Sequence, residues 1–298
     1  MDWIYFGTPG DLSRLARPRD GIDSPRDQRT SAVTLAGGGA VVHALRGGLR
    51  TYTLRWSSLE DTHGTTLAVL EEYAYGLRGS GPFALLDPGR LNLLTTNQSS
   101  GTGALADTTG FTASAGTLAS STAVARRGTR SLLWTLAAGT TATLALDAAA
   151  SWWPGTPAME GVSYALSLQA LGGGTDLVVE LTAQLQWLDA AGVTLSTSSG
   201  TPVSTSGDWT AVSAVAVAPA GAVYLLPLLA VTGATVGAGA TVALDELQLE
   251  SGGVASGWRP GTGVYPVAIV GGMDESQPWA DPGYREGVTL ILQEVGSQ

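Results

Sequence analysis

Tryptophan is the residue type in this chain best suited to contact a ligand. Nine tryptophans occur in 298 residues, and Trp152 and Trp153 stand side by side before a Pro-Gly turn. Because successive residues of an extended segment point to opposite sides, one of these rings can pack while the other stays exposed. An exposed indole can stack on the C–H face of a sugar ring. Trp152 and Trp153 are therefore candidate carbohydrate-binding residues, and an anchor for a loop or an interface is the alternative.

The other aromatic residues divide into one further candidate and several core positions. Trp209 follows Asp208 and is the third candidate for sugar contact, with packing at the rim of a domain as its alternative. Trp187 lies on the apolar side of an alternating segment, which predicts a core position. Tyr164 follows the same pattern, so we expect it in the core as well.

Side chains suited to catalysis are scarce. The chain has no cysteine, and neither of its two histidines, His43 and His63, lies beside a nucleophile or carboxylate motif. Asp189 and Glu180 are the best carboxylate pair for a glycosidase, but both fit surface strand or turn positions. No phosphate-binding loop, nucleophile elbow or zinc-binding helix motif is present. The sequence therefore predicts that the protein is not an enzyme.

The composition is typical of strands and turns rather than of a disordered chain, because 44% of the residues are apolar and only 13% are charged. The net charge is −10, and residues 91–258 hold three Arg against ten acidic residues. A segment without a basic stripe is not expected to bind nucleic acid. The N-terminus lacks the features of a signal peptide, and the longest apolar stretch is broken by prolines. Neither secretion nor membrane insertion is expected.

Strand signals run along most of the chain. Alternating or β-branched runs predict strands at 32–35, 40–45, 51–56, 83–86, 131–136, 141–146, 162–170, 177–188, 193–197, 210–217, 222–231, 241–249, 264–270 and 288–295. One helix is predicted near residues 59–77, where Ser58 and Asp61 resemble a capping box. Residues 8–31, rich in Arg, Asp, Pro and Gly, predict an extended arm, with a solvated loop as the alternative.

These strands indicate two domains, one inserted into the other. Residues 92–258 contain eight strands at roughly even spacing with Gly-rich connections, which predicts a jelly-roll β-sandwich. The strands of residues 1–91 and 259–298 are too few to be stable separately. We expect them to form one discontinuous domain in which 288–295 pairs with an N-terminal strand. The predicted fold class is all-β with one helix.

The inserted segment resembles carbohydrate-binding modules of the family 4/9 type. The resemblance rests on the order and spacing of short motifs, among them Gln186-Trp187-Leu188-Asp189, Asp208-Trp209-Thr210 and Asp245-Glu246-Leu247-Gln248-Leu249-Glu250. It implies sugar contact and a structural Ca²⁺ held by Asp245 with oxygens near Asn92 and Asn97. Calcium needs six to eight oxygen ligands, and the sequence offers two or three. The alternative is that Asp245 caps a turn or accepts hydrogen bonds at the edge of a sheet.

The flanking segments resemble the tail-tube fold of siphophage tail tube and distal tail proteins, and the combination with the insert resembles minor tail proteins of actinobacterial phages. Residues 51–56, the helix near 59–77 and the closing strand at 287–292 follow that plan. The resemblance implies a virion protein of the tail tip or baseplate, made in the host cytoplasm and not secreted. A carbohydrate-binding module of a polysaccharide-degrading system is the alternative function.

The same resemblance implies particular partners. A ring of six copies is expected, in contact with tail tube, tape-measure and tail-hub proteins, and with host surface polysaccharide as a further partner. The arm mixes cationic and acidic residues, a pattern suited to pairing with a neighbouring subunit in a closed ring. Its cationic residues are the candidate oligomer contacts: Arg14, Arg17, Arg19, Arg26 and Arg29.

Overall fold

The chain forms two compact units in the computed structural model. The structure describes residues 3–18, 22–23, 30–34, 40–44, 49–60, 66–87, 92–138, 141–147, 153–174, 178–231, 239–276 and 284–295. The first unit comprises residues 1–8, 13–85 and 265–298, and the second comprises residues 9–12 and 86–264. Both chain ends thus belong to one unit, and the second unit is almost continuous in sequence.

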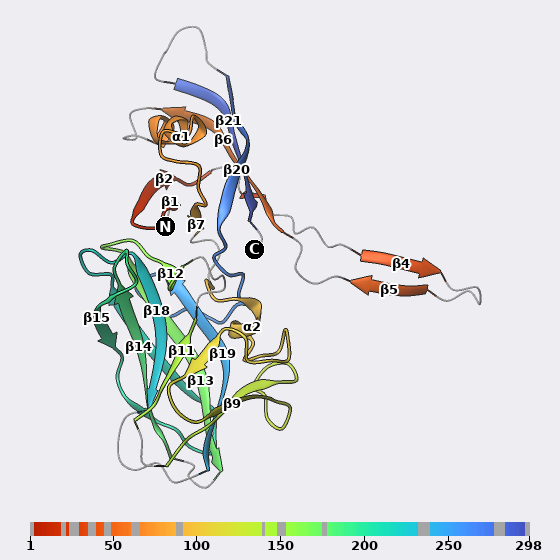
Figure 1. The fold of residues 1–298 in the computed structure, drawn as a ribbon, viewed down its shortest axis with the longest axis vertical. Coiled ribbons are helices and arrows are strands. Elements are labelled where there is room, and N and C mark those ends of the chain that lie inside the picture. Colours follow the sequence, from red (N-terminus) through yellow and green to blue (C-terminus); the bar gives the residue numbers. More distant parts are fainter. Residues whose placement is uncertain are drawn as a thin grey trace. The chain divides into compact units, whose positions relative to one another are not determined.

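A four-stranded sheet joins the two ends of the chain in the first unit (Figure 1). Its order is β20-β21-β6-β3, with all neighbours antiparallel. The strands are β3 (Ile22–Asp23), β6 (Thr51–Glu60), β20 (Val267–Ser276) and β21 (Tyr284–Glu294). The ladder between β21 and β6 runs from Tyr284 opposite Glu60 to Gln293 opposite Thr51. The predicted ladder between the C-terminal strand and an N-terminal strand is therefore confirmed.

Three further groups of elements complete the first unit. A second sheet has the order β2-β1-β7, a hairpin pairs β4 with β5, and one helix contributes to the core. Their bounds are β1 (Trp3–Thr8), β2 (Asp11–Ala16), β4 (Thr30–Thr34), β5 (Ala40–Ala44), α1 (Thr66–Ala74) and β7 (Ala84–Leu86). The core includes three rings, Phe6, Tyr73 and Phe83, whose centroids lie 4.9–5.2 Å apart. Such tilted and edge contacts are the favoured geometry for aromatic pairs.

Two sequence expectations for this unit are wrong. Residues 11–16 form strand β2 rather than part of an arm, because β1 supplies a pairing partner and Leu15 is fully buried. The indole N–H of Trp56 also donates to the carbonyl of Ala16 at 2.9 Å. Ser58 lies within β6 rather than at the start of a helix, since pairing with β21 extends that strand. Arg19, Arg26 and Arg29 lie outside the described residues.

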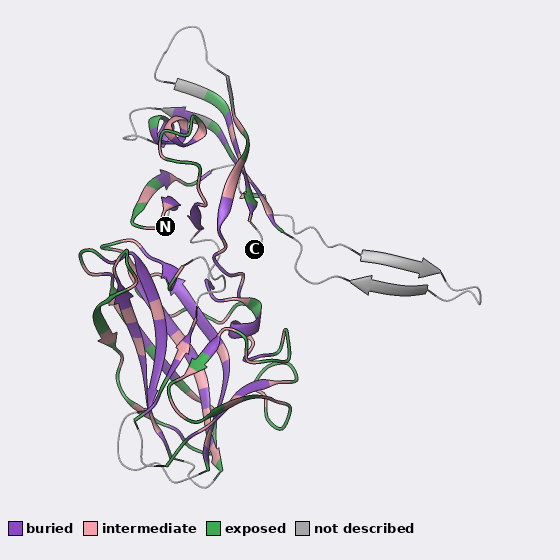
Figure 2. Cartoon of the chain, in the orientation of Figure 1, coloured by how far each residue is buried: buried purple, intermediate pink, exposed green. Residues whose placement is uncertain are grey.

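The second unit is a β-sandwich of two antiparallel sheets. One sheet has the order β17-β13-β19-β10-β9; the other has the order β15-β14-β18-β11-β8, with β12 and β16 beside it. Figure 2 shows buried residues along the strands of both sheets. The strands are β8 (Phe111–Ala113), β9 (Thr117–Ser121), β10 (Ser131–Thr135), β11 (Thr143–Leu146), β12 (Thr156–Pro157), β13 (Ser163–Gly174), β14 (Glu180–Leu188), β15 (Thr194–Ser199), β16 (Val203–Ser204), β17 (Thr210–Val217), β18 (Tyr224–Val231) and β19 (Ala240–Ser251). The predicted all-β class and jelly-roll β-sandwich are confirmed.

The predicted count of one helix is wrong, because a short second helix opens the sandwich. Helix α2 (Thr96–Ser99) begins with a capping box in which Thr95 and Gln98 bond to each other's backbone N–H. The amide of Gln98 also donates to the carbonyls of Gly110 and Asp147. A four-residue helix has too few apolar positions to produce a helical pattern in the sequence, so periodicity could not predict it.

Hydrogen bonds join the beginning and the end of the second unit. The backbone N–H of Leu93 donates to Leu249 at 2.7 Å, and that of Gly263 donates to Leu94 at 2.8 Å. The Asn92 side chain lies between these segments and donates to the carbonyls of Leu247 and Arg259. The two ends of the sandwich therefore lie side by side, as an insertion into another domain requires.

Candidate functional site

The outer face of the seven-stranded sheet gathers apolar and amide side chains. The central strands β14 and β18 alternate, with Trp187 and Leu225 fully buried in the sandwich core. Because side chains of a strand alternate between its two faces, the intervening residues point outward. They form three cross-strand pairs: Leu188 with Tyr224, Gln186 with Leu226, and Gln184 with Leu228.

Trp153 packs at one end of this outer face. Trp153 and Leu226 are partly buried against a small cluster formed by Leu188, Val223 and Tyr224. Burial raises the pKa of the Tyr224 hydroxyl above its usual value of 10.0. Farther along β14, the Gln184 amide donates to the Ser199 hydroxyl of β15 at 3.1 Å. Leu188, Tyr224 and Leu228 are themselves buried, so the accessible part of the face consists of Trp153, Leu226 and the two glutamines. It combines an aromatic and an aliphatic side chain with amides that can donate and accept hydrogen bonds.

Two of the three tryptophans proposed as sugar contacts are described, and they lie at different sheets. Trp153 packs on the face just described, whereas Trp209 is half-buried directly before β17, in the other sheet. Trp152 lies outside the described residues. The predicted core positions of Trp187 and Tyr164 are confirmed, since both are fully buried and their rings lie 5.9 Å apart.

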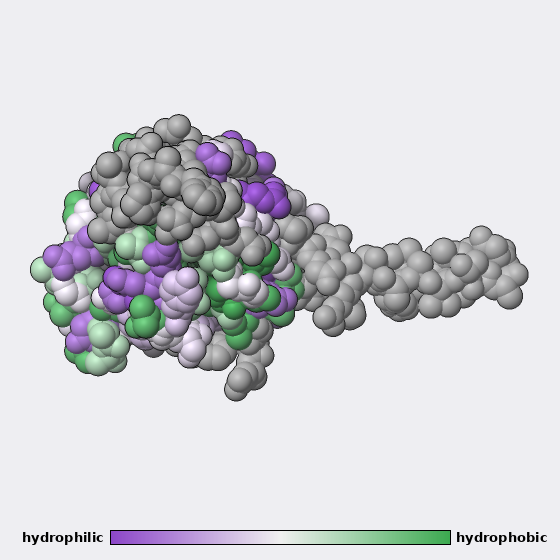
Figure 3. Space-filling view, turned by 90° about the horizontal axis from the view of Figure 1, so that it is seen from above, coloured by the Kyte–Doolittle hydropathy of each residue, from purple (hydrophilic) through white to green (hydrophobic). Residues whose placement is uncertain are grey.

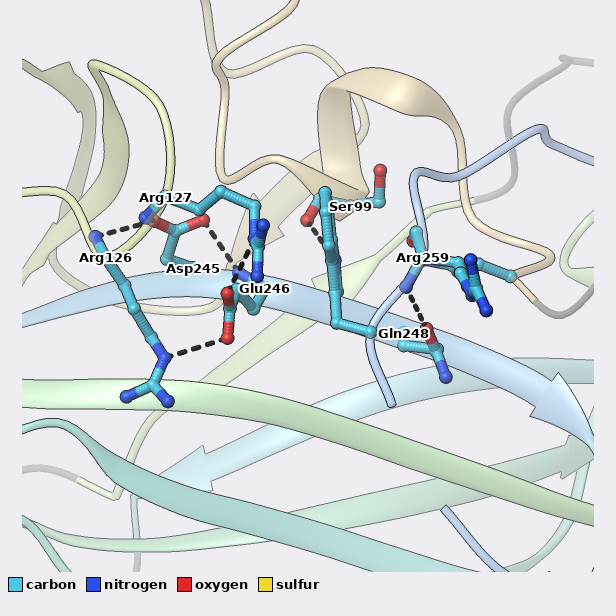
Figure 4. A network of polar contacts seen from close by, with 9 residues as sticks. Ser99, Arg126, Arg127, Asp245, Glu246, Gln248 and Arg259 are labelled. Atoms are coloured by element: carbon cyan, nitrogen blue, oxygen red, sulfur yellow. Dashed lines mark hydrogen bonds and ion pairs between the residues drawn. The ribbon is translucent and has the colours of Figure 1, made fainter. Parts of the chain in front are cut away.

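An acidic pair in β19 holds the loop that connects β9 and β10 (Figure 4). The buried carboxylate of Asp245 accepts hydrogen bonds from the backbone N–H groups of Arg126 and Arg127, both at 2.8 Å, and from that of Glu246 at 2.7 Å. Burial raises the pKa of Asp245 above its usual value of 3.8, and these three bonds act in the opposite direction. Glu246 in turn bonds the side chains of both arginines.

Backbone N–H groups occupy the side-chain oxygens of the residues proposed as calcium ligands. Asp245 is occupied by the three N–H groups above, and the Asn92 oxygen accepts from the N–H groups of Leu94 and Leu249. The Asn97 oxygen accepts from Leu105. An oxygen facing N–H donors is not oriented toward a cation, so this arrangement does not fit a calcium site. Among the described residues, no three His, Cys, Asp or Glu side chains cluster as metal ligands.

The carboxylates considered as a glycosidase pair are far apart. Glu180 begins β14 and Asp189 directly follows its end. Nine residues of extended chain separate them by about 30 Å, several times the separation that glycoside hydrolysis requires. Asp189 instead closes a turn by accepting from the N–H groups of Ala191 and Val193. His63 lies outside the described residues.

A buried ion pair in the first unit gave no signal in the sequence. Arg50 and Glu294 are each 6% exposed, and the Glu294 carboxylate accepts from the Arg50 backbone N–H at 2.9 Å and from the Tyr52 hydroxyl at 2.6 Å. The two residues are 244 positions apart, and only the pairing of β6 with β21 brings them together. Their role is to join the two ends of the chain.

The proposed oligomer contacts that are described lie in or near β2. Arg14 is exposed, and its guanidinium lies 4.0 Å from the centroid of the Trp3 ring. Arg17, just after β2, is exposed as well.

On the face drawn in Figure 3, hydrophilic and hydrophobic residues interleave over the described surface. None of the described helices is long and apolar enough to cross a membrane.

Comparisons with known proteins give only distant structural likenesses. No protein family and no curated protein matches the sequence. A xylan-binding domain of Xyn10C from Paenibacillus barcinonensis is 16% identical with a TM-score of 0.37, covering 50% of this chain and 90% of that domain. TmCBM61, solved with β-1,4-galactotriose, is 16% identical with a TM-score of 0.36, covering 54% of this chain and 99% of the module.

A domain of tailspike protein 4 from bacteriophage CBA120 is similar at the same level. It is 15% identical with a TM-score of 0.38, and the match covers 56% of this chain and 22% of the tailspike chain. These TM-scores are too low to establish a common fold. The function proposed below therefore rests on the residues of this chain.

Proposed function

We propose that the second unit binds carbohydrate through the outer face of its seven-stranded sheet. The observation that carries the proposal is the packing of Trp153 beside Tyr224 and Leu226, next to the amides of Gln184 and Gln186 on the adjoining strand. Aromatic and aliphatic side chains can cover the C–H face of a sugar, and amides can bond its hydroxyl groups. None of these five side chains is charged at neutral pH, which suits a neutral polysaccharide.

The test compares two tryptophans of the same unit. We expect Trp153→Ala to weaken binding of a neutral polysaccharide at least about tenfold, the usual cost of removing an aromatic anchor. Trp209→Ala is the matched control, because Trp209 is also half-buried but lies directly before β17 of the other sheet. Affinity electrophoresis against a panel that includes xylan and β-1,4-galactan gives the measurement, and circular dichroism checks that both variants fold. Equal losses in the two variants would exclude the proposed face.

A second candidate function, a ring subunit of a phage tail tip or baseplate, is favoured by the discontinuous first unit. The sandwich is inserted between β7 and β20, and Phe83 and Val267 at these flanks form a β-bridge. A scaffold that presents a module from its middle suits an assembly component. Electron microscopy of the purified full chain is the test: closed rings, with six copies expected, support this function, whereas monomers at all concentrations contradict it.

The proposed contact of the arm in a ring needs a milder test than deletion of the whole arm. Since residues 11–16 belong to a sheet, deleting residues 8–31 would damage the first unit as well as any contact between subunits. Arg17→Gln is a milder change, because Arg17 is exposed and lies just beyond β2. If Arg17 contributes to a ring, the variant should shift the balance from rings to monomers while the chain stays folded, which thermal unfolding checks. Rings of normal abundance would remove Arg17 from the contact.

A further inference from the structure

We propose that Arg126 and Arg127 form a binding site for an anionic group, a carboxylate or a phosphate, carried by a polysaccharide. The inference rests on the proposed function in taking a polysaccharide as the ligand, but it concerns a different sheet and different residues. Four observations support it: the distribution of charge, a bulge in β19, the unused donors of the two arginines, and the stacking of one of them on Trp258.

Positive charge in the inserted segment is confined to one loop. Residues 91–258 contain three arginines and no lysine, and all three lie within residues 126–130, between β9 and β10. The same segment carries ten acidic residues. Cationic side chains that served only to keep the protein soluble would be spread over its surface. The second unit has two further arginines, Arg90 and Arg259, just outside this segment, so three of its five arginines lie in this loop. Their concentration in one loop of an acidic unit makes that loop a place where an anion is attracted.

A bulge in β19 lets two neighbouring carboxylates reach this loop. Glu246 and Leu247 together stand opposite one residue of β13, and Glu246 has a φ of 51°, a value uncommon for a residue other than glycine. In a regular strand, Asp245 and Glu246 would point to opposite faces. The bulge breaks that alternation, so Asp245 fixes the backbone of Arg126 and Arg127 while Glu246 fixes their side chains. Strained backbone of this kind clusters at functional sites.

Both guanidinium groups keep donors that can bind a ligand. Each uses its Nε to donate to Glu246 at 2.8 Å, and within the described part of the chain no acceptor bonds the Nη atoms of either residue. The side chains of Arg126 and Arg127 are 39% and 59% exposed. Glu246 pairs with both guanidinium groups, whereas the buried Asp245 carboxylate accepts only backbone N–H groups. The Nη groups of two neighbouring arginines are thus held at the surface, where a ligand can reach them.

Contact with Trp258 also fixes the orientation of the Arg127 guanidinium group. Its guanidinium carbon lies 4.8 Å from the centroid of the Trp258 ring, and the Trp258 N–H donates to the carbonyl of Ser99 at 3.0 Å. Figure 4 shows Arg126 and Arg127 converging on Glu246 from the same loop. A guanidinium already held in place loses little conformational entropy on binding, and its planar fork matches the two oxygens of a carboxylate or phosphate.

Two variants of the full chain test the proposal. Arg127→Gln removes one fork, and Arg55→Gln is the matched control: Arg55 is 55% exposed and pairs with Asp23 at 2.8 Å, as Arg127 pairs with Glu246. Titration calorimetry uses oligogalacturonate for carboxylate, a phosphomannan for phosphate, a neutral mannan and inorganic phosphate. We expect one anionic polymer to bind, with affinity falling as salt rises, and Arg127→Gln to weaken it roughly tenfold, the value of a charged hydrogen bond. Arg55→Gln should bind as the wild type does.

The proposal is overturned if neither anionic polymer binds more tightly than the neutral mannan, if inorganic phosphate binds as tightly as the polymer, or if both variants lose affinity equally. Thermal unfolding shows whether the variants are folded, and Arg126→Gln repeats the test at the second fork. Trp153→Ala separates this proposal from the preceding one. Loss of neutral-polysaccharide binding in Trp153→Ala with unchanged anion binding in Arg127→Gln would defeat only the arginine site. The opposite pattern would defeat only the tryptophan face.

Discussion

The two units use the same pair of residue types, Arg and Glu, in opposite ways. In the first unit, Arg50 and Glu294 are buried and join strands from the two ends of the chain. In the second, Glu246 is mostly buried, but its partners Arg126 and Arg127 are exposed. A buried ion pair is costly to break because its surviving charge stays out of water, whereas an exposed pair contributes little to stability. The first arrangement therefore stabilises the fold, and the second leaves donors available for a ligand.

The units also differ in how their cores are assembled. The first unit's core draws residues from β1, β6, α1 and the C-terminal strands, so it needs both chain ends. The core of the second unit lies within a nearly continuous segment. Truncation should therefore affect the two units very differently.

The largest expected effect follows from removing the C-terminal strands. Deleting residues 265–298 removes β20 and β21 and leaves β6 paired only with β3, so the first unit should unfold completely. An isolated segment of residues 86–264 should still unfold cooperatively, because the bonds between its two ends are retained. Circular dichroism during urea denaturation measures both results. Persistence of the first unit's transition in the truncated chain would contradict the comparison.

A shorter segment tests where the second unit ends. Residues 92–258 omit residues 259–263, which make seven hydrogen bonds to the rest of the second unit, among them those to Asn92, Ser99 and Leu94. At about 1 kcal/mol for each bond, this segment should be less stable than residues 86–264 by up to roughly 7 kcal/mol. Equal denaturation midpoints would show that the exit segment adds nothing to the sandwich.

The next effect is expected at the buried pair. Glu294→Gln leaves Arg50 charged and buried, at a cost of about 3–5 kcal/mol in the free energy of unfolding of the first unit. The control is Glu72→Gln, since Glu72 pairs with Arg78 at the surface with 42% of its side chain exposed, and its loss should cost less than about 1 kcal/mol. Chemical denaturation resolves the two units as separate transitions. Similar losses in the two variants would remove the distinction between buried and exposed pairs.

The smallest expected effect concerns Asp245. Replacing it with Asn leaves one acceptor oxygen where the carboxylate serves three N–H groups, which should cost the second unit about 1–3 kcal/mol at neutral pH. The raised pKa means that the folded state binds the proton more tightly than the unfolded state. The stability gained from protonating Asp245 in the folded state is therefore full below pH 3.8 and is lost as pH rises through the raised pKa. A plot of the free energy of unfolding against pH should show this decline for the wild type and lack it for Asp245→Asn. An identical decline in both proteins would assign it to another group.

Much of the fold could be predicted from alternation alone. The period-two pattern around Trp187 and Tyr164 predicted core positions that the structure confirms, because one face of each strand must be buried. Strand β2, which lies within the predicted arm, could not be predicted from alternation. Asp11–Ala16 contains few apolar residues, and it forms a strand because β1 lies beside it.

The short strands β8, β9, β12 and β16 are absent from the strands that the sequence predicts. By itself, the sequence determined the all-β class, eight strands of the sandwich, the pairing of the C-terminal strand with an N-terminal one, and the clustering of Arg126, Arg127 and Arg130. All of these depend on local composition, periodicity or the need of a short strand for a partner. Only the tertiary structure decided which side chains meet. The bulge at Glu246 turns two adjacent acids toward Arg126 and Arg127, and the ladder of β21 with β6 brings Glu294 to Arg50. No local pattern encodes such contacts, because their partners come from distant segments and meet only when the sheets form.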